Sequence, residues 1–446
     1  MIYQIKKAIK KLTPAFLLGW YHFLLAFLAA FVYGWPSKRM AVIGVVGTRG
    51  KTTAANFIWA VLSAAGYKTG LTGTANIRIG DEEFLNRFHM TMPGRFTMQK
   101  LLKQMADAGC EYAIIETPSE GVEQWRHKGI IYDILIFTGI YPEYLAAHKW
   151  SFERCKEMNL KVLKELFNSQ RKKINNKKIP KVIIANKDNE YFSEATSFAA
   201  DRKISYAIDS SADFQAGKIK ETLSGGFFAV DGWEFKINLI GKFNILNVLP
   251  AVALANVLEI KKDKIKKGLG SLYKIGGRME EIKAGQKFSV FVDYAHDVVS
   301  LEAALEAAAK IKKKSGRIIL LLGAEGGGRD KKKRPLMGEL AAQKADLVVI
   351  SNVDPYDDEP SEILESIARP AEQAGKIRWK NLFVIENRTE GIRQSLVLAQ
   401  KDDIVLITGK GAEQAMIIGP KRIYWDDRKI VGDILKQILT SKRRPR

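Results

Sequence analysis

The sequence predicts an α/β protein in which two mostly parallel sheets are covered by helices and a hydrophobic helix precedes the first sheet. Apolar runs of strand length alternate with helical segments, first from about residue 41 and again from about residue 288. Such alternation is typical of parallel sheets with helices on both faces. A chain of 446 residues, 46% of them apolar, can fill the cores of two domains. We therefore predict three parts, residues 1–40, 41–272 and 273–446.

Residues 1–40 are basic and hydrophobic. A run of nineteen residues without formal charge, Ala15 to Tyr33, follows Lys6, Lys7, Lys10, Lys11 and Pro14. The run is long enough to cross a bilayer, but a single span would put the lysines opposite a cytosolic body, against the bias for positive charge inside. We expect a helix at the membrane surface or a re-entrant hairpin, with Trp20, Tyr21 and Trp35 near the headgroups. The alternative is a helix packed on the protein itself.

A glycine-rich loop follows the first predicted strand, Ala41 to Val46, and precedes a helical segment, Ala54 to Ala65. It reads Gly44-Val45-Val46-Gly47-Thr48-Arg49-Gly50-Lys51-Thr52-Thr53. In this setting backbone N–H groups surround a polyphosphate, a lysine reaches its outer phosphates and a threonine hydroxyl binds Mg²⁺. The strict spacing Gly-x4-Gly-Lys-Thr fails because Val45 stands where glycine is required. The loop still predicts a central P-loop ATPase-like domain, with a plain glycine turn as the alternative.

The remaining elements follow in two series. In the central domain the strands are Thr69 to Thr74, Tyr112 to Glu116, Ile134 to Thr138 and Val182 to Asn186, with helices from Thr97 to Ala108 and from Phe152 to Phe167. Asp231-Gly232 between two apolar runs predicts a β-hairpin. The second domain, Rossmann-like and α/β, begins near Tyr273 with strands at Ser289 to Val292, Arg317 to Leu322, Leu347 to Ser351, Leu382 to Ile385 and Ile404 to Thr408.

Charge and cysteine content narrow the class of protein. The formal net charge is +22, with basic runs at 171–181, 261–267, 310–314, 331–334 and 442–446. Solvated faces, acidic substrates and an anionic membrane all explain such runs. No helix-turn-helix, zinc-finger or RNA-binding motif accompanies them, so we expect no nucleic-acid partner. The two cysteines, Cys110 and Cys155, provide no disulfide framework, which favours a cytoplasmic location.

Short motifs in a fixed order resemble the Mur ligase family of ATP-dependent amide ligases. Besides the loop they are Thr91-Met92-Pro93, Glu116 to Arg126, Phe137-Thr138, Asn186-Lys187-Asp188, Gly241 to Asn247, Gly277-Arg278-Met279-Glu280, Asp293-Tyr294-Ala295-His296 and Gly326 to Pro335. The resemblance covers about residues 41 to 430, and the last three motifs are most similar to the MurE type, which adds the third residue of the peptidoglycan stem peptide. It implies that a carboxylate attacks the γ-phosphate of ATP and that an amine then displaces phosphate to leave an amide. Cations and positioning should dominate such catalysis.

The resemblance implies roles for single residues. Lys51, Glu116 and His296 would be catalytic, and Thr52 and Glu116 would bind Mg²⁺. ATP would contact Gly47, Thr48, Gly50, Lys51, Thr52, Thr53, Asn244, Asn247, Arg278, Asp293 and Tyr294. The acceptor peptide would face Thr91, Ser119 and Arg126, and the incoming amino acid would face Arg329, Asp354 and Glu413, the last pairing its ammonium. Several of these residues could also have a purely structural role. Glu116 would then be a solvated acid, and Asn244 and Asn247 a helix cap and part of a polar face. His296 would be a structural histidine, and Arg329 and Glu413 would be surface charges.

Several positions depart from the family pattern. Tyr144 replaces a histidine that helps to bind a second metal ion, and Asn159 stands where a carbamylated lysine aligns best, with Lys156, Lys161 and Lys164 nearby. A second Mg²⁺ is therefore in doubt. Val353-Asp354-Pro355-Tyr356 replaces Asp-Asn-Pro-Arg, so the pocket lacks the arginine that suits diaminopimelate, and a different amino acid is expected. Ala412 replaces another histidine, and the hydrophobic helix stands where these ligases have a uridine-binding domain.

The leading prediction is an ATP-dependent ligase that joins an amino acid to a carboxylate of a peptidoglycan precursor of the UDP-MurNAc-peptide type. ATP and Mg²⁺ would be its cofactors, and it would work in the cytoplasm at the inner face of the cell membrane, held there by residues 15–33. Such an enzyme would serve cell-wall biogenesis, cell shape and cell division. Two alternatives stay open: the same chemistry on a folate-like, polyglutamate or lipid-linked acceptor, and a membrane-associated ATP-binding switch without ligase activity.

Overall fold

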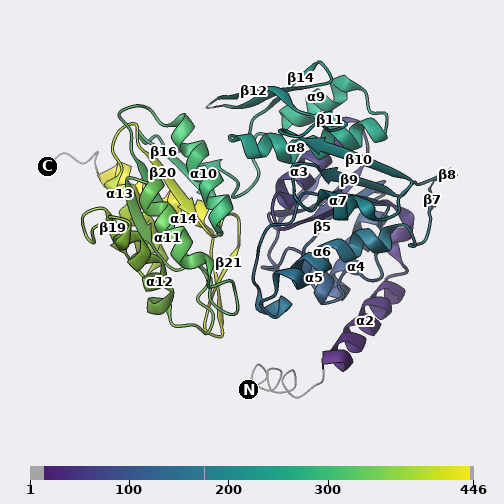
Figure 1. Ribbon diagram of the computed structural model, residues 1–446, viewed down its shortest axis with the longest axis horizontal. Helices are drawn as coiled ribbons and strands as arrows, with labels where there is room; N and C mark the ends of the chain where they lie inside the picture. Colours follow the sequence, from purple (N-terminus) through teal and green to yellow (C-terminus); the bar gives the residue numbers. More distant parts are fainter. Residues whose placement is uncertain (1–14, 175, 223, 442–446) are drawn as a thin grey trace.

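Two α/β bodies lie side by side in the computed structural model, which describes residues 15–441 except 175 and 223 (Figure 1). The first body, drawn in purple to teal, carries the larger sheet, and the second, in green to yellow, carries the smaller one. The predicted α/β class with two mostly parallel sheets is confirmed. Lys6, Lys7, Lys10 and Lys11 and the basic run 442–446 lie outside the described residues.

The larger sheet belongs to the middle of the chain. Its strands are β1 (Ala41–Val46), β2 (Thr69–Thr72), β3 (Asn76–Ile79), β4 (Glu82–Leu85), β5 (Tyr112–Thr117), β6 (Ile134–Phe137), β9 (Val182–Asn186), β10 (Arg202–Ala207) and β11 (Phe214–Gln215). Within the described residues their order is β11-β10-β9-β6-β1-β5-β2-β3-β4, parallel from β11 to β2 and antiparallel at β3 and β4. The central strand β1 is buried along its whole length, as expected of a strand covered on both faces.

Helices cover both faces of this sheet. They are α3 (Lys51–Ala64), α4 (Arg95–Asp107), α5 (Ser119–Glu123), α6 (Phe152–Leu166), α7 (Phe192–Ser197), α8 (Lys242–Val257) and α9 (Lys262–Ser271). Side chains of β1 alternate between two cores: Ile43 and Val45 pack with α3 and α8, whereas Val42 and Val46 pack with α4 and α6. The loop after β1 therefore leaves the carboxyl edge of the sheet between two helical layers, where open α/β sheets bind ligands.

Small antiparallel sheets complete the first body. They are formed by β12 (Gly217–Thr222), β13 (Gly225–Val230) and β14 (Trp233–Ile237), and by β7 (Lys173–Ile174) with β8 (Lys177–Lys178). Asp231 and Gly232 link β13 to β14 with φ of 48° and 77°, the left-handed values that a two-residue hairpin turn requires. The predicted hairpin is confirmed.

The second body has its own parallel sheet. Its strands are β15 (Glu280–Glu281), β16 (Ser289–Asp293), β17 (Ile318–Leu322), β18 (Leu347–Ile350), β19 (Leu382–Val384) and β20 (Ile404–Thr408), and a hairpin adds β21 (Ala415–Ile418) and β22 (Lys421–Tyr424). The order in the described chain is β15-β16-β20-β17-β18-β19, with only β15 antiparallel. The helices are α10 (Val298–Ile311), α11 (Lys333–Lys344), α12 (Pro360–Gln373), α13 (Arg388–Leu398) and α14 (Asp427–Ser441). The strands expected in both bodies are present, with ends that differ by at most two residues.

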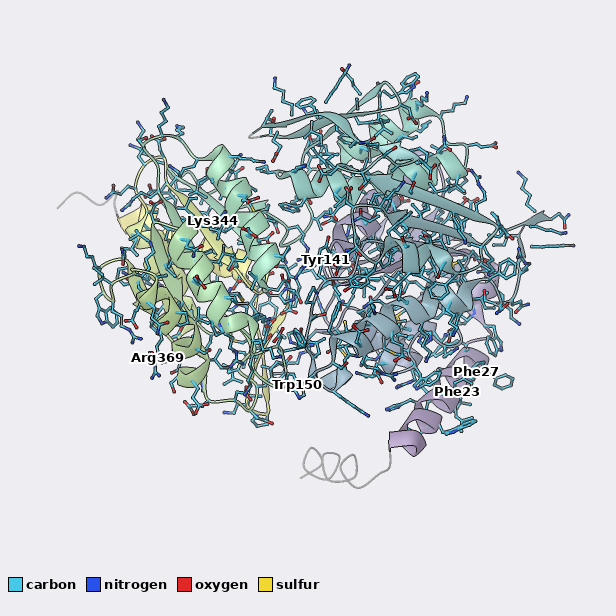
Figure 2. The ribbon with its side chains drawn as sticks, viewed as in Figure 1. Phe23, Phe27, Tyr141, Trp150, Lys344 and Arg369 are labelled. Atoms are coloured by element: carbon cyan, nitrogen blue, oxygen red, sulfur yellow. The ribbon has the colours of Figure 1, made fainter. Side chains whose placement is uncertain are left out.

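The N-terminal helix α2 (Ala15–Val32) packs one face on the first body. Ala26, Ala29 and Ala30 are buried. The ring of Phe23, labelled on α2 in Figure 2, meets the ring of Trp125 edge-on at 5.5 Å. A short 3-10 helix, Pro36–Arg39, then leads into β1. Because α2 is continuous, a re-entrant hairpin within residues 15–32 is wrong. Among the described residues, no helix combines the length and the apolarity needed to cross a bilayer.

Candidate active site between the two domains

The glycine-rich loop connects β1 to α3. Lys51 is the first residue of α3, and its ammonium donates to the carbonyls of Gly47 (2.6 Å) and Thr48 (3.0 Å). Gly47 and Gly50 have φ of 133° and 79°, and a Cβ on Gly47 would lie 2.3 Å from Oγ1 of Thr138. Only glycine fits these two positions, as in loops whose backbone approaches a polyphosphate closely.

A buried carboxylate lies beside the loop. Glu116 of β5 accepts hydrogen bonds from Oγ1 of Thr52 (3.0 Å) and from the backbone N (2.9 Å) and hydroxyl (3.0 Å) of Thr74. Burial raises the pKa of Glu116, and the Lys51 ammonium opposes that shift. Burial lowers the pKa of Lys51, and Glu116 opposes that shift. Mg²⁺ prefers hydroxyl and carboxylate oxygens, so the donor set of Thr52 and Glu116 fits it.

Arg278 connects the second domain to this site. Its Nη2 donates to Oγ1 of Thr52 at 3.1 Å, and its guanidinium lies 4.4 Å from the ring of Tyr294. The Tyr294 hydroxyl donates in turn to Oε1 of Glu413 at 3.2 Å. Thr52, Arg278, Tyr294 and Glu413 therefore form one line of contacts across the domain boundary.

Arg49 makes a second contact between the domains, which the sequence motifs did not single out. It forms an ion pair with Asp297 at 2.8 Å and lies 4.5 Å from the ring of Tyr141, which Figure 2 places at the boundary. Burial alone would raise the pKa of Asp297, but Arg49 and His296 hold it below its usual value. This ion pair anchors the loop to the start of α10.

Asn244 and Asn247, both predicted to contact ATP on the adenine side, have different surroundings. A Cβ on Gly50 would lie 2.3 Å from Oδ1 of Asn247, so Asn247 lies against the loop. Asn244 is buried and donates from Nδ2 to the carbonyl of Ile240 at 2.7 Å, close to the start of α8. Its buried Oδ1 has no hydrogen-bond partner among the described residues, and the cap position of α8 belongs to Gly241. Thr53, the remaining predicted loop contact, is buried in the first turn of α3.

Asp293 and His296 support their neighbours on the second domain. The carboxylate of Asp293 accepts the backbone N–H groups of Met279 (2.7 Å) and Ala295 (2.8 Å), and burial raises its pKa against the effect of Arg278. His296 lies with Nδ1 2.9 Å from the carbonyl of Tyr294. These contacts orient Arg278 and Tyr294, and in the described structure the hydrogen bond of His296 is to Tyr294 rather than to Lys51 or Glu116.

The residues expected to face the acceptor all lie on the first domain. Thr91 pairs with Thr74 at 2.9 Å, which links it to Glu116. Ser119 at the start of α5 pairs with Nε2 of the buried His148 at 2.9 Å, a partner that the motifs did not indicate. Arg126 donates to the carbonyl of Met92 and to Gln124, and burial lowers its pKa. The Arg126 guanidinium therefore fastens the segment that carries Thr91.

Asp354 and Glu413, both predicted to face the incoming amino acid, lie close together. Lys410 joins them, with its ammonium 2.7 Å from Oδ2 of Asp354 and 2.5 Å from Oε2 of Glu413. Burial would lower the pKa of Lys410, but the two carboxylates raise it above its usual value. Burial raises the pKa of Asp354, against the effect of Lys410. Lys410 belongs to the Gly-Lys-Gly run before Glu413, so its position was visible in the sequence although its role was not.

Arg329, also expected to face the amino acid, reaches the first domain instead. Its Nη1 lies 2.6 Å from Oε1 of Glu120 on α5. Burial alone would lower the pKa of Arg329, but Glu120 and Glu325 raise it. Glu120 is next to Ser119, so this ion pair lies beside the acceptor residues. Arg329 is therefore not simply a surface charge.

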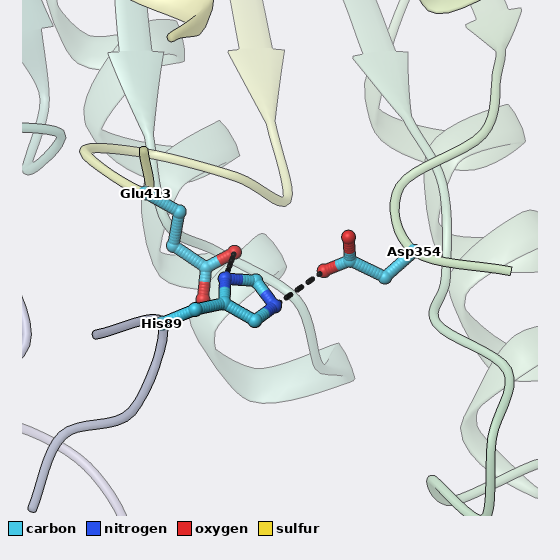
Figure 3. A group of neighbouring side chains, drawn as sticks. All are labelled: His89, Asp354 and Glu413. Atoms are coloured by element: carbon cyan, nitrogen blue, oxygen red, sulfur yellow. Dashed lines mark ion pairs between the residues drawn. The ribbon is translucent and has the colours of Figure 1, made fainter. Parts of the chain in front are cut away.

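His89 is the functional candidate that sequence reasoning missed. It reaches from the first domain to the acidic pair, with Nε2 3.6 Å from Oδ2 of Asp354 and Nδ1 3.8 Å from Oε2 of Glu413 (Figure 3). The three side chains could suggest a metal site. However, the two ring nitrogens face different carboxylates (Figure 3). The two oxygens nearest the ring, Oδ2 of Asp354 and Oε2 of Glu413, already accept hydrogen bonds from Lys410. No motif contains His89, and only the fold brings it here.

The positions that depart from the family pattern have other partners. The ammonium of Lys332 lies 4.5 Å from the ring centre of Tyr144. Asn159 is buried on α6 and donates to the carbonyl of Cys155 at 2.9 Å. An aromatic ring next to a cation is a poor candidate for a metal ligand, whereas the buried Oδ1 of Asn159 has no hydrogen-bond partner among the described residues.

Comparisons with known proteins agree with this geometry. Two family models match, the Mur ligase middle domain over residues 45–255 and the Mur ligase glutamate ligase domain over residues 277–411. A UDP-N-acetylmuramoyl-L-alanyl-D-glutamate--2,6-diaminopimelate ligase of Clostridium acetobutylicum is 33% identical over 420 residues, 93% of this chain and 82% of that protein. A UDP-N-acetylmuramyl-tripeptide synthetase of Roseiflexus sp. is 35% identical over 411 residues, 90% of this chain and 80% of that protein. A solved folylpolyglutamate synthase of Mycobacterium tuberculosis shares the fold, with a TM-score of 0.68 at 15% identity over 95% of this chain and 96% of that chain.

Proposed function

The chain belongs to the Mur ligase family, and from that membership we propose that it uses ATP to join an amino acid to a carboxylate of a peptidoglycan precursor of the UDP-MurNAc-peptide type. One observation carries the proposal. Thr52 beside the phosphate loop and Glu413 in the amino-acid pocket are joined by Arg278 and Tyr294 across the domain boundary. Phosphate chemistry and amine attack can therefore share one site.

Different residues serve the two steps of the reaction, phosphoryl transfer and amide formation. First, an acceptor carboxylate oxygen bonds to the γ-phosphorus, and the bond to the β-phosphate oxygen breaks to release ADP. Lys51 and Arg278 are the cations placed to neutralise the transferred phosphoryl group. Thr52 and Glu116 would hold Mg²⁺, which supplies further positive charge at the phosphates.

The second step forms the amide. The amino acid nitrogen bonds to the acyl carbon, and the bond to the phosphate oxygen breaks. Ser119 and Arg126 are proposed to orient the acceptor, while Asp354 and Glu413 attract the ammonium of the amino acid. Holding both partners at one site supplies the positioning on which such catalysis depends.

We propose that the amino acid is not diaminopimelate. Tyr356 occupies the position at which the resembling MurE-type enzymes have arginine, and a phenol cannot form the bidentate pair with a second carboxylate that a guanidinium forms. The acidic pair favours an amino acid with an ammonium and no distal carboxylate.

We also propose that the enzyme works at the inner face of the cell membrane. What supports this proposal is the outer face of α2, where Trp20, Leu24, Leu28 and Phe31 are 49% to 71% exposed and repeat at helical spacing. Four lysines precede the helix in the sequence, which suits an anionic lipid surface. A helix lying in the interface needs neither a span nor a hairpin.

A ligation assay tests the main proposal. Purified protein receives ATP, Mg²⁺, UDP-MurNAc-dipeptide and a panel of amino acids, and released phosphate and product mass are measured. We expect phosphate release and a mass gain only when both substrates are present. A product formed only with a lipid-linked or folate-like acceptor would transfer the proposal to that acceptor. ATP hydrolysis indifferent to every amino acid and acceptor would contradict it and favour the nucleotide switch.

A further inference from the structure

His89 occupies a defined place between the domains. It lies in the segment that joins β4 to α4 of the first domain, yet its ring faces Asp354 and Glu413 of the second (Figure 3). Its side chain is only 11% exposed. An imidazole placed against two carboxylates and shielded from water is positioned to exchange protons with whatever binds between them.

The backbone around His89 is held firmly. Asn86 donates to the carbonyls of Gly73 (2.7 Å) and Met90 (2.9 Å) and accepts the N–H of Phe88 at 2.8 Å. His89 itself has φ of 54°, a left-handed value that few residues other than glycine adopt. From the second domain, the side chain of Arg422 on β22 binds the carbonyl of Arg87. The ring is therefore presented to the acidic pair by contacts on both sides of it.

His89 differs from Asp354 and Glu413 in its hydrogen bonding. Oδ1 of Asp354 accepts the N–H of Ile417 (2.8 Å), and Oδ2 accepts Lys410. Oε1 of Glu413 accepts the hydroxyl of Tyr294, and Oε2 accepts Lys410. All four carboxylate oxygens thus have donors. Nδ1 of His89 is buried and lacks a hydrogen-bond partner among the described residues.

The charge around the ring attracts a cation. Asp354 and Glu413 contribute two negative charges when ionised, and Lys410 contributes one positive charge. The other titratable or charged groups near this acidic pair are the phenols of Tyr294 and Tyr356, Arg329, which is paired with Glu120, and, across the loop backbone, Arg422. One negative charge remains uncompensated, so an ammonium group is the complementary ligand, and it would lie against the imidazole.

We propose that His89 accepts the proton that the ammonium of the incoming amino acid must lose before it attacks; the proposal rests on the proposed ligase function. The proton moves from the ammonium to Nδ1, and the imidazolium stands beside the two carboxylates. The freed electron pair of the nitrogen bonds to the acyl carbon, the bond to the phosphate oxygen breaks, and phosphate leaves with that electron pair and with the second amine proton. No further reactant is needed.

The test compares the native chain with His89→Gln, which keeps a polar side chain but cannot accept a proton, and with Arg87→Ala as an exposed control on the same segment. At pH 7 we expect His89→Gln to lower kcat for ligation roughly 10²-fold, with less than about a threefold change in KM for ATP and acceptor. Its kcat should rise about tenfold per pH unit up to pH 9, because the free amine then forms without help. Arg87→Ala should match the native enzyme.

A second measurement separates this role from a structural one. Acyl phosphate formed without amino acid, trapped as a hydroxamate, should be unchanged in His89→Gln, and added imidazole should restore ligation by His89→Gly. An unchanged pH profile, or loss of acyl phosphate together with ligation, would overturn the proposal. Absence of ligation by the native chain would instead overturn the proposed function, so the two failures are distinguishable.

Discussion

Nη2 of Arg278 in the second domain donates a hydrogen bond to Oγ1 of Thr52 in the first domain, 3.1 Å away. Thr52 donates at the same time to Glu116. An arginine from one domain thus meets the hydroxyl and carboxylate proposed to bind the metal ion in the other. Because the site is completed only when the domains meet, catalysis should depend on residues far apart in the sequence.

Replacing Arg278 should affect chemistry more than folding. Arg278→Ala should lower kcat/KM for ATP about 10²-fold, since a charge-assisted contact at the phosphates is lost. Arg278→Lys should recover only part of the activity because an ammonium cannot replace the planar fork. Steady-state kinetics measure the effect, with Arg393→Ala, whose side chain makes an exposed contact from α13 to Gln437, as the control. Equal kinetics for Arg278→Ala and the native enzyme would refute the assigned role.

Removing the charge of Glu116 should weaken metal binding. In Glu116→Gln the side chain can still pair with Thr52 and Thr74, but one anionic ligand for Mg²⁺ is missing. We expect the Mg²⁺ concentration for half-maximal activity to rise at least about tenfold, measured by titrating Mg²⁺ at fixed ATP. Thermal unfolding without Mg²⁺ reports stability separately. An unshifted Mg²⁺ dependence would exclude Glu116 as a ligand.

Acid should weaken the first domain through Glu123. Burial alone would raise the pKa of Glu123, but the hydrogen bonds from Arg154 and the nearby His148, with Nδ1 3.5 Å from Oε2, outweigh it and lower the pKa to about 2. Because the pKa is lower in the folded than in the unfolded chain, ionised Glu123 stabilises the folded protein at pH values above the unfolded pKa near 4.5. This contribution is lost as the pH falls from 4.5 toward 2. The loss should be on the order of 1 to 2 kcal/mol, since part-exposed Arg154 is screened. The free energy of unfolding, measured with urea over this pH range, should fall less with acid in Glu123→Gln than in the native protein.

The outer face of α2 should bind anionic vesicles. The native chain should sediment with vesicles that contain phosphatidylglycerol and much less with phosphatidylcholine alone. Replacing Leu24 and Phe31 by glutamate should lower the bound fraction at least fivefold while leaving ligation of a soluble acceptor unchanged. Val397→Glu, at an exposed apolar position on α13, is the matched control. Equal binding by the doubly substituted chain and the native chain would count against a lipid surface.

Tyr356→Arg should change amino-acid selection. The new guanidinium would offer a bidentate partner to a second carboxylate, so kcat/KM for diaminopimelate should rise roughly tenfold relative to the preferred amino acid. Tyr356→Phe, which removes only the hydroxyl, should leave the ratio unchanged. Competition between two amino acids, analysed by product mass, gives this ratio directly. A ratio that does not move in Tyr356→Arg would place the selecting group elsewhere.

Much of the fold could be predicted because its signals are local. The alternation of apolar runs and helical segments identified both sheets, and Asp231-Gly232 identified the hairpin, since strand burial and turn conformation depend on neighbouring residues. The glycine-rich loop between β1 and α3 was visible for the same reason. The N-terminal helix was predicted correctly as a helix, but its hydropathy did not reveal that small residues at Ala26, Ala29 and Ala30 pack on the body while large ones face outward.

The sequence by itself determined the α/β class, the glycine-rich turn from β1 into α3 and the family to which the chain belongs, because each of these depends on residue types at short, fixed spacing. Only the tertiary structure decided which charges meet. Arg278 with Thr52, Arg329 with Glu120, and His89 with Asp354 and Glu413 join segments 209 to 324 residues apart. Hydrogen bonds and ion pairs form only between atoms a few ångströms apart, and no periodicity along the chain encodes the distance between two domains.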